Sequence, residues 1–289
     1  MKFKFIVFAL ITMFFLSFKS IAAQTNSLRI EQEGKLLVNQ EKADIVWQWL
    51  QDEYINNQTR LSQLDPSLTS NSSEEQFTDT YYDTPKQELL DKQNSVRHRQ
   101  RENITNPADR KSGQELVQIK LSNISDNQLN RSEYKYEVDL TNKFPNQHPL
   151  IGIIKKAQRD DFINQLADID IKASSLRPVL VLKDYRKRLY FEKDGKPFIS
   201  ISLDQTQTNK WWFKAEFTEI EFELNEITYT ENDEMGRKYM ESINHQIIEE
   251  IKAQFPDIVT DLTPKYNKAF KGLEKKIPFF RSLIRWGII

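Results

Sequence analysis

The sequence contains no cysteine, and its 289 residues include only 3 histidines, 7 glycines and 10 prolines. The absence of cysteine excludes disulfides, thiolate catalysis and cysteine-bound zinc, so packing alone must hold the core. His98, His148 and His245 show no metal-ligand spacing, and we expect them in structural or surface positions. The scarcity of glycine and proline leaves no low-complexity linker, and the length suits one large domain or two small ones.

The first residues have the features of a secretory signal. Lys2 and Lys4 precede an apolar run over residues 5–18, which is too short to span a membrane comfortably, and small residues follow as far as Ala23. We therefore predict a signal peptide over residues 1–22 and an exported mature chain that is periplasmic or secreted. An uncleaved membrane anchor is the alternative interpretation of the same run.

Charge is balanced over the whole chain, with 41 basic and 42 acidic residues and a formal net charge of −1. The predicted leader holds Lys2, Lys4 and Lys19 and no acid, so its removal takes the net charge from −1 to −4. Such a balance argues against a general nucleic-acid binder, which would carry an excess of positive charge. The sequence leaves the oligomeric state open.

Alternating apolar and polar residues predict a series of two-faced strands, because successive side chains of a strand point to opposite faces. These runs cover residues 28–38, 76–84, 94–102, 114–122, 131–140, 177–193, 198–204 and 211–224. Helical spacing of apolar residues predicts helices over residues 41–55, 150–167 and 233–255. The polar run over residues 67–75 indicates a loop. The fold class that follows is α+β.

The polar faces of these strands sort their charges by sign. The first and last strands carry acids, and the strands between them carry bases. The acids are Glu31, Glu33, Glu219, Glu221 and Glu223, and the bases are Arg97, Arg99, Arg101, Lys120, Arg131, Arg186 and Arg188. A single strand of this kind usually has its charged face exposed to solvent and no further role. If the whole sheet closes on itself, however, the charged faces converge on one interior and the apolar faces point outward under the helices.

Such an interior implies a ligand. Desolvating each Arg or Lys side chain costs several kcal/mol, so the buried bases must be paired with anions. Phosphate suits arginine, because the guanidinium fork makes bidentate, charge-assisted hydrogen bonds. A carboxylate cluster facing a polyanion requires a hard dication between them, and Mg²⁺ or Mn²⁺ takes oxygen ligands from both. The sorted charges therefore predict a metal-dependent site for polyphosphate or a nucleoside triphosphate.

Several short motifs follow one another in a fixed order. They are Glu31-Gln32-Glu33-Gly34-Lys35, Tyr81-Tyr82-Asp83-Thr84, Ser95-Val96-Arg97-His98-Arg99, Gln118-Ile119-Lys120, Arg131-Ser132-Glu133, Asp204, Glu219-Ile220-Glu221 and Pro264-Lys265-Tyr266. The first resembles the ExExK signature that opens the CYTH, or triphosphate tunnel metalloenzyme, superfamily, and the others resemble its later motifs. The ordered set is more specific than ExExK alone, and the resemblance covers residues 27–272.

The resemblance implies a closed eight-stranded antiparallel β-tunnel with helices packed outside. It implies hydrolysis of a triphosphate, either inorganic tripolyphosphate or a nucleoside or organic triphosphate, by in-line attack of water with Mg²⁺ or Mn²⁺ on the acids. The implied catalytic residues are Glu31, Glu33 and Lys35, and the implied metal ligands are Glu31, Glu33, Glu133, Asp204, Glu219 and Glu221. The implied phosphate-binding residues are Arg97, Arg99, Lys120, Arg131, Arg186, Arg188 and Lys265.

Three alternatives to hydrolysis use the same residues. A non-enzymatic polyphosphate- or anion-binding protein of the cell envelope would need the bases more than the acids. A polyphosphate polymerase or a nucleotide cyclase would need both, although an exported protein meets little ATP.

Two aromatic segments remain. We expect Trp211-Trp212 to pack in the wall of the sheet rather than to stack on bases. Residues 273–289 form a basic amphipathic tail, in which Lys275, Lys276, Arg281 and Arg285 are mixed with large apolar residues. This tail is either a terminal helix docked on the core or a segment in peripheral contact with a membrane surface.

Overall fold

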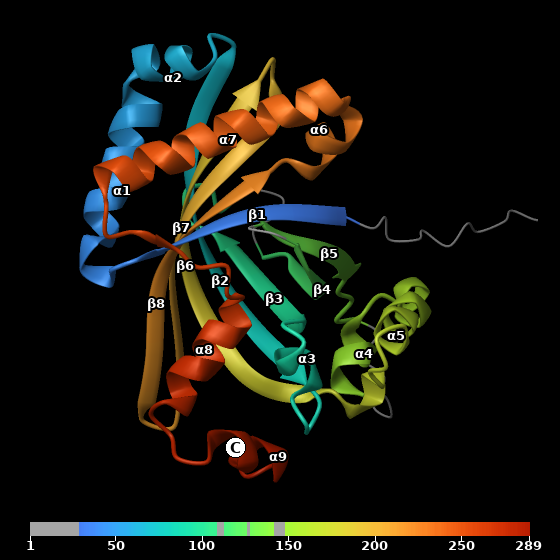
Figure 1. Ribbon diagram of the computed structural model, residues 1–289. Helices are drawn as coiled ribbons and strands as arrows, with labels where there is room; N and C mark the ends of the chain where they lie inside the picture. The colour runs from blue at the N-terminus through green and yellow to red at the C-terminus, as the bar shows by residue number, and fades with distance from the viewer. Residues whose placement is uncertain (1–28, 109–112, 126–127, 142–147) are drawn as a thin grey trace, which may run out of the picture.

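The computed structural model describes residues 29–108, 113–125, 128–141 and 148–289, so the predicted signal peptide over residues 1–22 lies outside the described residues. The chain has an α+β fold (Figure 1). Its strands are β1 Arg29–Val38, β2 Leu68–Asp83, β3 Ser95–Asn103, β4 Glu115–Ser125, β5 Gln128–Glu137, β6 Arg177–Lys193, β7 Lys196–Lys210, β8 Phe213–Leu224 and β9 Val259–Thr260. Its α-helices are α1 Ala43–Gln51, α2 Gln58–Leu64, α3 Glu88–Asp91, α4 Pro149–Ile153, α5 Arg159–Ala167, α6 Glu226–Glu231, α7 Glu234–Gln254, α8 Lys265–Glu274 and α9 Phe280–Arg285.

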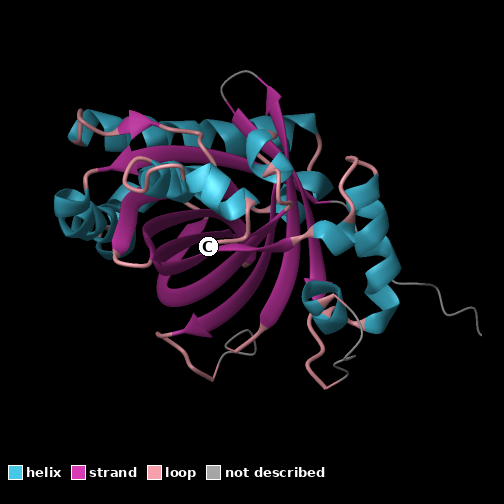
Figure 2. Cartoon of the chain, turned by 90° about the horizontal axis from the view of Figure 1, so that it is seen from below, coloured by secondary structure: helices cyan, strands magenta, loops and turns pink. Residues whose placement is uncertain are grey.

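The strands form one nine-stranded antiparallel sheet in the order β5-β4-β3-β2-β6-β7-β8-β1-β9. The ninth strand, β9, adds only two residues to the edge of β1 and was not predicted. β1 pairs with β8 through Glu33–Val38 and also with β5 through Arg29–Glu33. The two ends of the strand order therefore meet at β1, and Figure 2 shows how strongly the sheet curls.

Helices cover the sheet in three separate patches. α1, α2 and α7 pack against β1, β6, β7 and β8 in the upper part of Figure 1, and α4 and α5 pack against β3, β4 and β5. α8 and α9 form the third core with Leu180 and Leu182 of β6. Because Leu180 and Leu182 share a strand face with Arg186, α8 lies on the same side of the sheet as the charged residues. The predicted division into an apolar outside and a charged inside therefore holds only for part of the sheet.

The predicted helices are present, but two of them are divided. The region of residues 41–55 consists of a 3₁₀ turn at Gln40–Lys42, α1 and a π-helical turn at Asp52–Asn56. α7 follows the prediction for residues 233–255, and Asp233 caps it by accepting a hydrogen bond from the Gly236 amide. The region of residues 150–167 is divided into α4, a 3₁₀ turn at Lys156–Gln158 and α5. The division arises because Ile154 leaves the helix and forms a β-bridge with Val138. No helix in the described ranges is both long enough and apolar enough to cross a membrane.

Three strand boundaries were predicted wrongly. β7 continues to Lys210, whereas the predicted run ends at residue 204. Residues 68–75 belong to β2 rather than to a loop, because the long β6 strand offers them ladder partners from Lys193 back to Arg186. Trp211 and Trp212 do not start a strand. They form the two-residue turn between Lys210 of β7 and Phe213 of β8, with side chains 50% and 82% exposed, so they do not pack in the wall.

Candidate functional site

Three carboxylates from two adjacent strands gather on the charged face. Asp204 of β7 lies opposite Glu219 of β8 in the ladder, and Glu221 follows two residues later on the same face. One oxygen from each of the three carboxylates lies within 4.8 Å of the others, and all three side chains are buried. Buried like charges at this spacing repel one another, so the cluster requires cations.

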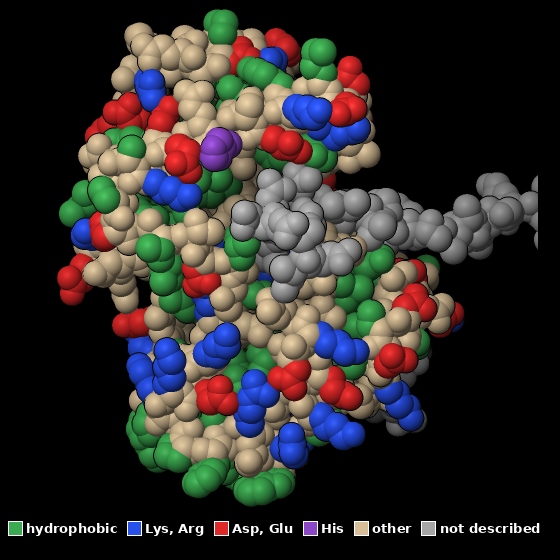
Figure 3. Space-filling model, in the orientation of Figure 1, with side chains coloured by type: hydrophobic (Ala, Val, Ile, Leu, Met, Phe, Trp, Pro, Cys, Tyr) green, Lys and Arg blue, Asp and Glu red, His purple; other side chains and the backbone are tan. Residues whose placement is uncertain are grey.

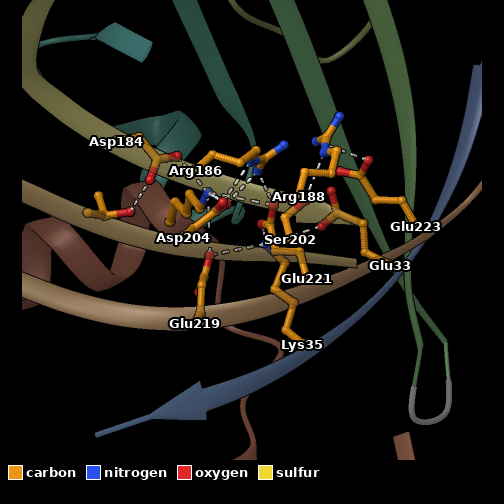
Figure 4. A network of polar contacts seen from close by, with 12 residues as sticks. Glu33, Lys35, Asp184, Arg186, Arg188, Ser202, Asp204, Glu219, Glu221 and Glu223 are labelled. Carbon is orange, nitrogen blue, oxygen red and sulfur yellow. Dashed lines mark hydrogen bonds and ion pairs between the residues drawn. The ribbon is translucent and has the colours of Figure 1, made fainter. Parts of the chain in front are cut away.

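Lys35 of β1 supplies the first of these cations (Figure 4). Its Nζ lies 2.5 Å from Glu221 Oε1, 3.2 Å from Glu33 Oε2 and 3.8 Å from Glu219 Oε1. Burial opposes the lysine charge, but these three carboxylates outweigh burial and raise the pKa of Lys35 above its usual range. The ammonium group is therefore permanently charged in the folded chain.

Arg186 and two lysines of α8 supply the others. Arg186 donates from Nε to Asp204 Oδ1 over 2.6 Å and from Nη2 to Glu221 Oε2 over 2.5 Å. Lys265 opens α8 and donates to Asp184 Oδ2 over 2.8 Å and to Asp204. Lys268, one turn later on the same helix, lies 2.6 Å from Glu219 Oε2. The first turn of α8 therefore helps to neutralise the acids of the sheet.

Burial affects the acids of this cluster unequally. Complete burial raises the pKa of Asp204 to about 7, with Asp184 and Glu221 adding to the effect and Arg186 and Lys265 opposing it. Burial also disfavours the charged form of Glu221, but Lys265, Lys35 and Arg186 together hold the pKa of Glu221 well below its usual range. The cluster thus contains one acid that titrates near neutrality beside one that remains a carboxylate.

A basic wall faces the acids. Arg97 and Arg99 of β3 share the buried Asp79 of β2, which accepts from Arg97 Nη1 over 3.1 Å and from Arg99 Nε over 2.7 Å. Burial opposes the charge on Asp79, but the two guanidinium groups outweigh it and lower the pKa of Asp79 to about 2. Arg97 also donates to Gln118 Oε1 over 2.7 Å, and this contact fixes its orientation.

Arg131 of β5 is a further member of this basic wall. Its Nη1 lies 3.7 Å from Glu33 Oε2, and Lys120 Nζ lies 3.2 Å from Glu33 Oε1. Arg131 is only 5% exposed, yet its Nε and Nη2 have no hydrogen-bond partner among the described residues. Because buried donors are nearly always hydrogen-bonded, these two groups need an acceptor beyond the described side chains, which is either Glu31, opposite Arg131 in the ladder, or a bound anion.

The acids and the basic wall meet at a small cavity. Its volume is about 30 Å³, and its lining includes Lys35, Glu221, Arg97, Arg131 and Lys265. This volume holds roughly one water molecule and no phosphate chain. A polyanion can therefore be accommodated only if side chains exchange some of their present ion pairs for contacts with it.

The structure brings most of the predicted site residues into this region. Those around the cavity are Glu33, Lys35, Arg97, Arg99, Lys120, Arg131, Arg186, Asp204, Glu219, Glu221 and Lys265. Glu133 is not part of the three-carboxylate cluster and contacts bases of β4 and β5 instead, 2.5 Å from Lys135 and 3.6 Å from Lys120. Arg188 lies further along β6, 3.6 Å from Glu223. Glu31 belongs to β1 opposite Arg131, but its side chain lies outside the described residues.

Four residues of the network were not predicted as site residues. Asp184 was already on the strand face of Arg186 and could have been included for that reason. Lys268 follows Lys265 by one helical turn, and this spacing could have predicted that both lysines lie on one face of a helix. Asp79 and Gln118 carry no such signal, because a lone acid or amide in a strand is indistinguishable from a solvated one until the neighbouring strands are known.

Comparisons with known proteins identify a domain family for the chain. The CYTH domain profile matches residues 51–253. No curated protein matches the chain. Solved structures similar to it include an adenylyl cyclase candidate from Hippeastrum described as having a dominant triphosphatase activity, at 15% identity and a TM-score of 0.45, covering 89% of this chain and 96% of that chain.

Two further solved structures have lower scores. A Pyrococcus horikoshii OT3 protein has 15% identity and a TM-score of 0.43, covering 86% of this chain and 99% of its own. The Mimivirus capping enzyme triphosphatase has 12% identity and a TM-score of 0.38, covering 79% of this chain and 92% of that chain. The CYTH match extends over more than half of the 289 residues and confirms the resemblance carried by the motifs: the chain belongs to the CYTH domain family.

Proposed function

We propose that the chain is a metal-dependent triphosphatase that hydrolyses inorganic tripolyphosphate or a nucleoside or organic triphosphate. The observation that carries the proposal is Arg131, a buried guanidinium group whose Nε and Nη2 have no hydrogen-bond partner among the described residues, in a wall of further bases. Arg97, Arg99 and Lys120 line the same wall, so a chain of phosphates would meet several cations in succession. The opposing carboxylates supply the second half of the site.

The curled sheet would act as a tunnel for the phosphate chain. The pairing of β1 with both β5 and β8 supports this part of the proposal. α8 covers one end of the charged face, with Lys265 pointing into the network. We therefore propose access from the opposite end, where Arg188 and Glu223 lie.

The acids suit a hard dication. Asp204, Glu219 and Glu221 offer only oxygen ligands, which Mg²⁺ and Mn²⁺ prefer, and buried Glu219 Oε1 has no hydrogen-bond donor within the described part of the chain. When bound there, such an ion would neutralise phosphate oxygens and activate water for in-line displacement. We propose Glu33 and Glu31 as further ligands, because they belong to the ExExK motif of the family.

The chain's own residues would bind and orient the substrate. Arg97, Arg99 and Arg131 would replace carboxylate partners by phosphate oxygens and spread the charge that develops at the transferred phosphoryl group. Lys35 would hold Glu33 and Glu221 in place by the ion pairs it already makes. Burial strengthens each of these contacts, because little water screens them.

A panel of triphosphates assayed with Mg²⁺ or Mn²⁺ tests the proposal, with released phosphate as the measurement. We expect turnover of at least one triphosphate in the presence of the metal and none in EDTA. Phosphate release that is unchanged in EDTA would reject the proposed chemistry. Chromatography of the products of the same reactions detects a polymerase by longer polyphosphate and a cyclase by cyclic nucleotide.

A non-enzymatic anion binder is the second candidate, and one observation favours it. Lys35, Lys265, Lys268 and Arg186 already neutralise the acid cluster without any metal. Such a protein would bind tripolyphosphate tightly, would turn over no triphosphate, and would bind equally well in EDTA. Calorimetry with and without EDTA distinguishes this behaviour from hydrolysis.

We also propose that the protein is exported and acts outside the cytoplasm, on the basis of the leader over residues 1–22. Sequencing the N-terminus of the protein recovered from the envelope or medium tests this. An N-terminus near Ala23 is expected, whereas Met1 on a cytoplasmic protein would reject the proposal.

A further inference from the structure

Large apolar side chains are exposed together at the end of the molecule that α9 occupies. Trp211 and Trp212 are 50% and 82% exposed, Phe279 81%, Trp286 68% and Ile288 59%. We call these five residues the aromatic end. Figure 3 shows hydrophobic and basic side chains gathered at the bottom of the molecule, where Figure 1 places the β7–β8 turn and α9.

The two segments that carry the aromatic end are fixed to each other. Lys276 donates from Nζ to the Lys214 carbonyl over 2.6 Å, which ties the tail to the start of β8. Ile277, Phe280 and Ile284 are buried in one core with Ala215 of β8. The tail is therefore docked by one set of apolar residues, and a second set remains on the surface.

Two of the exposed aromatic residues have costly backbone conformations. Trp211 and Phe279 have φ values of 54° and 56°, whereas the other non-glycine residues with positive φ in the described ranges are all Gln or Asp. A two-residue hairpin turn with positive φ at its first position favours Gly, and a bulky residue there is strained. Trp211 stacks on Trp212 with ring centroids 5.9 Å apart, but neither Trp211 nor Phe279 is fully buried in return for its backbone conformation.

Positive charge surrounds the aromatic end. The segments 210–216 and 271–289 contain seven bases and two acids, although the whole chain has a net charge of −1. The bases are Lys210, Lys214, Lys271, Lys275, Lys276, Arg281 and Arg285, and the acids are Glu216 and Glu274. A cavity of about 390 Å³ beside the turn is lined by Lys183, Asn209, Trp211, Trp212 and Lys214, so it combines aromatic walls with two ammonium groups.

We propose that the aromatic end docks the protein on the surface of a bilayer that contains anionic phospholipid. Tryptophan side chains prefer the headgroup level of a membrane, because one part of the ring is apolar and the indole N–H is polar. Lys and Arg at the same level are attracted to anionic headgroups. An ordinary protein partner would not require this excess of bases around exposed tryptophans. Docking in this way leaves the end of the sheet opposite α9 facing the aqueous phase.

Vesicle binding of the purified full chain tests the proposal. The probes are phosphatidylcholine vesicles with and without phosphatidylglycerol, and the measurements are co-sedimentation and tryptophan fluorescence. Residues 1–28 include an apolar run, so every comparison is made between variants that share the same N-terminus. We expect binding to the anionic vesicles, a blue shift in fluorescence, and weaker binding at high salt.

Matched variants identify the surface responsible. Trp211→Gly with Trp212→Asn suits the turn and should preserve the fold, and we expect it to bind anionic vesicles about tenfold more weakly. The control pair is Ile227→Ser with Met235→Ser, which removes side chains that are 63% and 80% exposed at α6 and α7. Equal binding by the turn variant and the unchanged chain, or an equal loss in the control pair, would overturn the proposal. A dimer without vesicles that the turn variant abolishes would overturn it in favour of self-association.

Discussion

Replacing Asp79 by asparagine should expose the anion-binding character of the basic wall. Asp79 is buried and neutralises both Arg97 and Arg99. Asparagine keeps the shape of the side chain and removes its charge, so two buried guanidinium groups lose their common partner. The pKa of Asp79 is about 2, against a usual 3.8. This difference corresponds to about 2 kcal/mol of folding free energy, and breaking a buried ion pair costs about 3–5 kcal/mol.

We therefore expect Asp79→Asn to lower the free energy of unfolding by about 3 kcal/mol, or Tm by about 6–12 °C. The pH dependence has a defined sign. The pKa of Asp79 is depressed in the folded state, so its contribution is complete above about pH 4 and is lost as the pH falls through about 2. The difference in stability between the unchanged chain and the variant should therefore vanish at about pH 2.

Tripolyphosphate should then restore stability selectively. An anion that binds only the folded state at a concentration 100 times its Kd adds about 2.7 kcal/mol. Because Arg97 and Arg99 are unpaired in the variant, Asp79→Asn should gain more from tripolyphosphate than the unchanged chain gains. The matched control is Asp65→Asn, which removes a carboxylate paired with Lys193 over 2.5 Å in a different region.

Thermal unfolding with and without tripolyphosphate measures all three proteins. We expect Asp65→Asn to lose stability and to show the same response to tripolyphosphate as the unchanged chain. If neither the unchanged chain nor Asp79→Asn gains stability from tripolyphosphate, the basic wall does not bind phosphate and the proposed function fails. Equal gains in these two proteins would show that Asp79 does not compete with phosphate for Arg97 and Arg99. An equal increase in both variants would instead indicate a general effect of polyanions on destabilised protein.

Two further predictions address the metal site and the unpartnered arginine. Mn²⁺ or Mg²⁺ should raise the Tm of the unchanged chain and of the surface variant Glu231→Gln, whereas Glu221→Gln should show a smaller increase because a ligand is lost. Equal increases in Tm with metal in both variants would show that Glu221 is not a metal ligand. Arg131→Met should lower kcat/KM for the preferred triphosphate at least about tenfold, with a loss of stability of about 1 kcal/mol, because its Nε and Nη2 make no hydrogen bond to the described residues. Unchanged kinetics in that variant, or an equal loss in Arg281→Met at the surface, would contradict the role assigned to Arg131.

The two-residue period of the strands was sufficient to predict which residues of the site share a face of the sheet. The alternation around Glu33 and Lys35 predicted one charged face, and β1 does place both side chains beside Glu221. Charge sorting predicted that acids and bases of distant strands would face each other, and Lys120 lies 3.2 Å from Glu33. These predictions worked because a period of two fixes which residues share a face, whatever the length of the connections.

The failures occur where a neighbouring element decides the local structure. Residues 68–75 are polar and resemble a loop, but the long partner strand β6 extends them into the ladder. Ile154 continues a helical pattern, yet its bridge to Val138 interrupts the helix. Trp211-Trp212 has high strand propensity and no glycine, so nothing in the sequence marks the turn that it forms. In each case the deciding contact comes from residues distant in the sequence.

The charge balance of the interior connects the two ligands proposed for it. Asp79, Glu33 and Asp204 each already lie beside at least one Lys or Arg, so the network is neutralised without any ligand. A triphosphate that takes over Arg97 and Arg99 displaces the carboxylate of Asp79 and adds negative charge to a buried region. Excess buried charge costs about several kcal/mol per ion, which a bound dication offsets. We therefore expect the polyanion to bind more tightly together with the metal than alone, because the dication offsets part of the negative charge that the polyanion adds.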